Sequence, residues 1–129
     1  MENAVKLLRW KEKVISGWES LEVAGVERFS SEDGFCILGE KFTQTVDMKL
    51  GILNPDDIKI EVLGVKNLQN GHRDFRKQKL DFIEMRDGNA RYACTIEPQD
   101  AGVWDYAIRV IPSNNLLPHD MDFNLVKWI

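Results

Sequence analysis

The stretch EPQDAGVWDYAIRVIP, Glu97–Pro112, decides the fold because it passes from an acidic turn into regular alternation. The side chains expected to face the core occupy every second position: Trp104, Tyr106, Ile108 and Val110. This period of two is typical of a strand with one buried face, since successive side chains of a strand point to opposite sides of the sheet. Pro112 lacks a backbone N–H donor and is expected to end the strand.

The same period recurs in earlier segments of the chain. The side chains predicted to face inward there are Phe42, Gln44, Val46, Met48 and Leu50, then Ile58, Ile60 and Val62, then Tyr92, Cys94 and Ile96. Turns at Asn54–Asp57 and Asp87–Asn89 separate the segments, and the second turn predicts a hairpin. The tail Asp122–Ile129 is a candidate for one more strand. About six or seven short strands, with turns every 8–12 residues, predict an antiparallel, immunoglobulin-like β-sandwich.

Three details of the strands are predicted less directly. Gly64 is expected to mark a bulge or the end of its strand. The basic segment His72–Lys79 is expected to be a solvated loop. The segment Lys79–Arg86 is expected to be a strand whose facing the pattern does not decide, because Leu80 and Phe82 disagree in register with Ile83 and Met85.

The first residues have a different period. Apolar side chains and one lysine recur there at helical spacing: Ala4, Leu7, Leu8, Lys11, Val14, Ile15 and Trp18. This pattern predicts one amphipathic α-helix that ends near Gly17. We therefore divide the chain into a helix at 1–19 and a β-sandwich at 20–129.

Composition limits the function classes. The chain has 129 residues, of which 43% are hydrophobic and 29% charged, which suits one globular domain. The net charge of -4 argues against a dedicated nucleic-acid binder. No apolar run is long enough to span a membrane, and the first residues do not resemble a signal peptide, so we expect a cytoplasmic protein.

No motif of catalysis or cofactor binding is present. The sequence contains no G-x-S-x-G, G-x-G-x-x-G or G-x-x-x-x-G-K-[ST] pattern. His72 and His119 are expected at the surface, and most carboxylates fall at turns. Cys36 and Cys94 lie far apart in sequence and are expected to be reduced thiols without a disulfide. We predict no catalytic, cofactor-binding or metal-binding residue in this chain.

Tryptophan leaves two interpretations open. Trp104 falls on the inward face of its segment by alternation. Trp10, Trp18 and Trp128 are candidates either for packing, in the core or against another domain, or for stacking on a sugar ring.

Three stretches together resemble the carboxy-terminal end of bacterial and archaeal α-glucan (glycogen) phosphorylases. They are the entry LRWKEKVISGWESLEV, then LGILNPDDIKIEVLG, then YACTIEPQDAGVWDYAIRVIPSNNLLPHDMDFNLVKWI. The matching positions are Leu50–Glu61, Gly102–Pro112, Leu116–His119 and Leu125–Trp128. The similarity covers most of the chain and is weak between Asn67 and Met85.

The resemblance implies a parent glycosyltransferase that releases glucose 1-phosphate from α-1,4-glucan with inorganic phosphate and pyridoxal phosphate. The cofactor would be held by upstream catalytic domains, and no catalytic residue carries over to this chain. The helix would then leave the catalytic region, the sandwich would be an appended domain that is inactive alone, and Met1 would be an introduced start. Two alternatives stay open: a carbohydrate-binding module that contacts α-glucan, and an unrelated immunoglobulin-like interaction domain.

Overall fold

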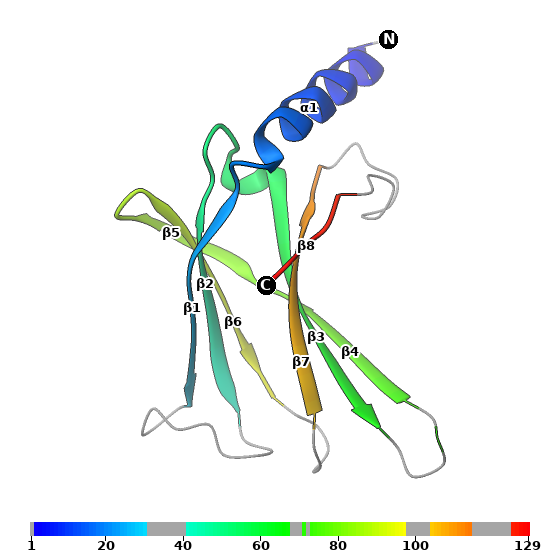
Figure 1. Ribbon diagram of the computed structural model, residues 1–129, viewed down its shortest axis with the longest axis vertical. Coiled ribbons are helices and arrows are strands. Elements are labelled where there is room, and N and C mark those ends of the chain that lie inside the picture. The colour runs from blue at the N-terminus through cyan, green and yellow to red at the C-terminus, as the bar shows by residue number, and fades with distance from the viewer. Residues whose placement is uncertain (1, 31–40, 68–70, 72, 98–103, 115–124) are drawn as a thin grey trace.

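The computed structural model describes residues 2–30, 41–67, 71, 73–97, 104–114 and 125–129. Within these residues one α-helix precedes two antiparallel β-sheets, which confirms an all-β sandwich with a helix at its amino-terminal end. Figure 1 shows α1 (Glu2–Trp18) projecting from one end of the sandwich, beyond the ends of the strands.

Each sheet has four strands in the described part of the chain. The first contains, in spatial order, β1 (Glu22–Ser30), β2 (Phe42–Lys49), β6 (Asn89–Ile96) and β5 (Asp81–Arg86). The second contains β4 (Arg73–Lys79), β3 (Ile58–Asn67), β7 (Trp104–Pro112) and β8 (Lys127–Trp128).

The core lies between the sheets and continues up to the helix. Val46 and Met48 of β2, Ile60 of β3 and Val110 of β7 are fully buried, as their alternation predicts. Trp10, Val14 and Trp18 of α1 belong to the same buried cluster, so the helix packs on the sandwich. Ile108 is buried and Tyr106 is half-buried, whereas the side chain of Trp104 lies outside the described part.

The segment β4–β5 changes sheets in the middle. β4 pairs with β3 in one sheet, β5 pairs with β6 in the other, and only Leu80 stands between them. The Leu80 side chain is buried, and its N–H donates to the Ile60 carbonyl at 2.9 Å. A strand that switches sheets makes a corner, so the two sheets are joined by continuous chain at this point.

Two expectations were wrong. Gly64 is no bulge or strand end, because it lies inside β3 and pairs in regular register with both Arg76 and Tyr106. The basic segment is no loop, because Arg73–Lys79 pairs along β3 as strand β4. A basic composition did not prevent strand formation here. The charged side chains of a strand at the border of a sheet can still reach water while its backbone pairs with the neighbouring strand.

The bulge lies elsewhere, in β5. Phe82 pairs with Tyr92 and Met85 with Ala90, and the register shifts between Phe82 and Glu84. The predicted hairpin of β5 and β6 is confirmed, with its turn at Asp87–Gly88 in the left-handed region. The extra residue resolves the conflicting pattern, because it puts Phe82 and Met85 on the same face of the sheet.

Candidate functional site

The junction between α1 and the sandwich is organised around one carboxylate. Asp57 ends the short 3-10 helix η1 (Pro55–Asp57), and its side chain is buried. Its Oδ1 accepts a hydrogen bond from Trp10 Nε1 at 2.9 Å, and its Oδ2 accepts from Lys13 Nζ and from the Asn54 N–H, both at 2.8 Å. Asp57 therefore connects the helix to the turn between β2 and β3.

These hydrogen bonds decide the charge state of Asp57. Burial by itself would raise the pKa of the carboxyl. Donation from Lys13, from the Asn54 N–H and from Trp10 outweighs burial, so the pKa of Asp57 lies below its ordinary value. The group stays ionised at neutral pH and holds both donors from α1.

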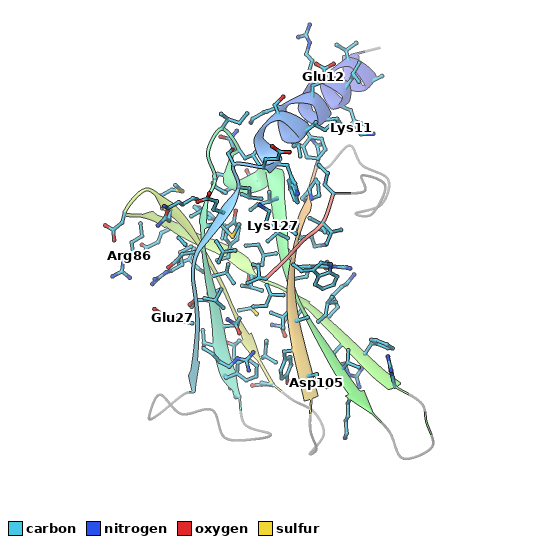
Figure 2. The ribbon with its side chains drawn as sticks, in the orientation of Figure 1. Lys11, Glu12, Glu27, Arg86, Asp105 and Lys127 are labelled. Carbon is cyan, nitrogen blue, oxygen red and sulfur yellow. The ribbon has the colours of Figure 1, made fainter. Side chains whose placement is uncertain are left out.

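The end of the helix is fixed by close packing and by β8. A side chain at Gly17 would place its Cβ 2.7 Å from Ile52 Cγ1, so glycine permits the close approach of the helix to this loop. Lys127 extends from β8 beneath α1 (Figure 2) and donates to the carbonyls of Trp18 and Leu21. The first carbonyl belongs to the last residue of α1 and the second lies three residues later, at the end of the helix where a cation is favourable.

The uncovered side of α1 carries three large apolar side chains beside the exposed Glu12. Val5, Leu8 and Ile15 are 48%, 59% and 59% exposed. Ile52, beside Gly17, is also exposed. The helix therefore has more apolar surface than the sandwich covers. Exposed apolar surface of this kind is typical of interaction sites.

A cavity of about 470 Å³ opens beside η1. Its wall includes Asp56 from η1, Lys79 and Phe82 from the sheet-switching segment, and Ser113 and Asn114 after β7. Tyr92 also lines the cavity, and its hydroxyl donates to the Pro55 carbonyl at 2.8 Å. Burial raises the pKa of Tyr92, and the carboxylates of Asp56 and Asp57 raise it further, so this hydroxyl is neutral.

A second buried carboxylate, Glu61, lies on the outer face of the sheet that contains β3. Glu61 of β3 is only 1% exposed. Arg109 on β7 donates to Glu61 Oε1 from Nε at 2.9 Å and from Nη2 at 2.8 Å. Lys59 and Lys77 approach Oε2 to 3.7 and 3.6 Å. The cluster joins three neighbouring strands and has the character of a structural ion pair.

The candidate tryptophans are placed in two environments. Trp10 and Trp18 are buried where α1 meets the sandwich, so the helix and sheets of this chain cover most of both rings. Trp128 on β8 is 59% exposed, opposite Arg109. Contact of these residues with a glycan or another domain remains a prediction.

Of the remaining candidates, Cys94 lies among the described residues. Cys94 is a free thiol, and burial, followed by the charge of Asp81, raises its pKa to about 11. Cys36, His72 and His119 lie outside the described residues. Within the described ranges, no three His, Cys, Asp or Glu side chains gather in a way that could hold a metal ion. No helix there has the length and hydropathy to cross a membrane.

The sequence interpretation missed Asp57 and Glu61. A signal for Asp57 was present, because Asn54 and Asp57 have the spacing of a capping box, which the structure contains. No signal distinguished Glu61, because it alternates with Ile60 and Val62 in the manner of an exposed residue.

The fold and its junction define a small antiparallel sandwich domain with a helix fastened to one end. The model of the family described as glycogen phosphorylase C-terminal domain matches residues 18–129. The chain belongs to this family.

A relative of known activity agrees with this assignment. Maltodextrin phosphorylase of Thermococcus litoralis is 28% identical to the chain over 133 aligned residues. The alignment covers 95% of the chain but 14% of the relative. The chain therefore spans about a seventh of the length of that enzyme.

Proposed function

We propose that this chain is the accessory carboxy-terminal domain of an α-glucan phosphorylase and that it stabilises the parent enzyme without taking part in catalysis. The observation that carries the proposal is the two-sided helix α1. One side is tied to the sandwich through Trp10 and Lys13, and the other presents exposed Val5, Leu8 and Ile15. The catalytic part of the parent chain is the proposed occupant of that exposed side.

The position of α1 supports this occupant. The family match begins at residue 18, where α1 ends, so the helix precedes the matched region. The aligned relative is about seven times longer than the matched region, and the family is named for the carboxy-terminal end of the enzyme. A helix at this place leads toward the larger part of the parent, which would cover its apolar side chains.

The parent activity belongs to the same proposal. We infer a glycosyltransferase that cleaves α-1,4-glucan with inorganic phosphate to give glucose 1-phosphate, with pyridoxal phosphate bound upstream. That cofactor requires a lysine held in a pocket with a phosphate cradle. Lys13 is paired with Asp57, and Lys127 donates to backbone carbonyls. The one lysine on the cavity wall, Lys79, shares it with Asp56, which repels phosphate.

Two further proposals concern the cellular location and the partners of the chain. A cytoplasmic location is proposed because Cys94 is a free thiol, which is usual in reducing compartments. Nucleic acid is not a proposed partner because the chain is acidic, with a net charge of -4. Family membership leaves no support for an unrelated interaction domain.

Charge introduced on the exposed side of α1 tests the docking surface in the full-length parent. The double substitution Leu8→Glu with Ile15→Glu should lower the thermal midpoint of the parent by several degrees, because it buries charge at the proposed contact. The matched control, Arg9→Gln with Ser16→Glu, changes the net charge equally on exposed positions of the helix and should leave the midpoint unchanged.

The 129-residue chain alone provides the second control. Leu8 and Ile15 are already exposed there, so the double variant should unfold at the same temperature as the original chain. An unchanged midpoint in the full-length parent would refute α1 as the docking surface.

A further inference from the structure

The cavity beside η1 has the chemistry of a site for a neutral, polyhydroxylated ligand. It measures about 470 Å³, which is within the range of small-molecule sites. The residues that line it include Asp56, Lys79, Ser113 and Asn114, whose side chains are all polar. These groups donate and accept hydrogen bonds in several directions, as a ring carrying hydroxyl groups would require.

The charges of the wall disfavour ionic ligands. Lys79 and Asp56, which carry opposite charges, both line the cavity, whereas both carboxylate oxygens of Asp57 are engaged by Trp10, Lys13 and the Asn54 N–H. A phosphate would be repelled by the Asp56 carboxylate, and a cation would be repelled by the Lys79 ammonium. A neutral ligand can use all of these groups without a net electrostatic penalty.

One aromatic ring supplies an apolar face. Phe82 is 43% exposed although it lies on the cavity wall. Its ring meets Tyr92 edge to face, with centroids 5.7 Å apart and planes at 66°. Tyr92 holds the Phe82 ring from one side, and the exposed part of the ring is available to the C–H face of a sugar.

The wall is fixed before any ligand arrives. Three hydrogen bonds join its segments: Ser113 N–H to the Asp57 carbonyl at 2.9 Å, Tyr92 hydroxyl to the Pro55 carbonyl at 2.8 Å, and Leu80 N–H to the Ile60 carbonyl at 2.9 Å. A site assembled in advance loses little conformational entropy on binding.

We propose that this cavity binds a glucose unit of α-1,4-glucan, with Phe82 under the sugar ring and Asp56 and Asn114 on its hydroxyl groups. The sugar class rests on the wall itself. The choice of α-1,4-glucan rests on the proposed parent activity. The domain would then hold polymeric substrate near the catalytic part of the parent.

Titration of the 15N-labelled 129-residue chain with maltoheptaose tests the site. Amide signals of Phe82, Tyr92, Ser113 and Asn114 should shift with ligand concentration. Phe82→Ala should weaken binding by roughly tenfold or more, as truncation of a central aromatic contact does. If Phe82→Ala does not fold, Phe82→Leu takes its place in the test. Leucine keeps apolar contact with Tyr92, and this variant should weaken binding in the same way. Asp56→Asn should also weaken it.

Matched aromatic controls lie outside the cavity. Phe75 on β4 and Trp128 on β8 are both exposed, so Phe75→Ala and Trp128→Ala should leave affinity unchanged within about twofold. Loss of binding in Trp128→Ala but not in Phe82→Ala would overturn the proposal and place the sugar on β8. Absence of shifts with maltoheptaose would overturn it as well.

Two other ligands separate this inference from the proposed function. Inorganic phosphate should shift none of the four amide signals, and shifts with phosphate would refute a neutral-sugar site. A β-1,4-linked glucan oligosaccharide that binds where maltoheptaose does not would refute α-glucan as ligand. Leu8 and Ile15 do not line the cavity, so the test of α1 as a docking surface and the test of sugar binding can each fail or succeed without the other.

Discussion

A single buried carboxylate connects three parts of this chain. Asp57 receives hydrogen bonds from the helix through Trp10 and Lys13, and its own turn closes through Asn54. Its backbone extends the connection, because the Asp57 carbonyl accepts from the Ser113 N–H after β7. Each donor offsets part of the cost of burying the charge, so the network is stable only as a whole.

Removal of this carboxylate should detach the helix. Asp57→Ala should cost about 2–4 kcal/mol in the free energy of unfolding, since it leaves the buried Trp10 N–H without its acceptor. Asp56→Ala, at the exposed neighbouring position, should cost less than about 0.5 kcal/mol. Urea unfolding measures both, and equal losses would contradict the assigned role of Asp57.

Asp57 also predicts the acid limit of the fold. Its folded pKa is lowered, so its contribution is complete above the unfolded value of about 4 and is lost as pH falls through the folded pKa. The hydrogen bond from Arg91 lowers the pKa of Asp47 in the same direction. Stability should therefore decline below about pH 4, and Asp57→Asn should decline less steeply. A parallel decline in both proteins, followed by thermal unfolding, would count against this explanation.

At the level of elements, β3 and β7 are joined by charge as well as by backbone pairing. Glu61 and Arg109 are direct partners in the register, and Arg109 donates twice to one carboxylate oxygen. A buried carboxylate of this kind contributes little net stability while paired. The loss of its partner is costly, because the remaining charge stays in a poorly hydrated place.

Arg109→Ala should therefore destabilise the sandwich by about 3 kcal/mol, in the range observed when buried pairs are broken. Lys77→Ala removes a cation that is more than half exposed at 3.6 Å from the same carboxylate and should cost less than about 1 kcal/mol. Replacement of both Glu61 and Arg109 by leucine should recover much of the loss. Chemical denaturation of the three variants gives the comparison, and a larger effect at Lys77 would contradict it.

The elements also show what the sequence could predict. Clean alternation identified β2 and β7, because one face of each strand packs on the core. The alternation pattern failed at β5, because a bulge puts Phe82 and Met85 on the same face of the sheet. It also failed at β4, because a row of charged residues led to the prediction of a loop where the chain forms a paired strand. The cavity was not predictable, because its wall joins segments that only the tertiary fold brings together.

At the level of the whole molecule, the two sheets and the helix depend on one another. The chain crosses from one sheet to the other at Leu80, and Gln78 on β4 donates to the Thr95 carbonyl on β6 at 2.7 Å. The helix shares the same buried cluster through Val14 and Trp18. We expect helix and sandwich to unfold in one cooperative transition.

The whole chain should be inactive by itself. Supplied with maltodextrin, inorganic phosphate and pyridoxal phosphate, it should release no glucose 1-phosphate, because glycosyl transfer requires donors and charges organised around the reacting atoms. A coupled assay of glucose 1-phosphate measures this directly. Release in proportion to the concentration of the purified chain would refute an accessory role.

The charges of β4 have a consequence for solubility. Among the described strands, β4 borders its sheet, so its outer backbone groups are a template on which another chain could add a strand. Arg73, Arg76, Lys77 and Lys79 all lie on this strand. Two copies that approached through β4 would bring two rows of positive charge together. The basic residues that led to the prediction of a loop therefore also discourage aggregation of the folded protein.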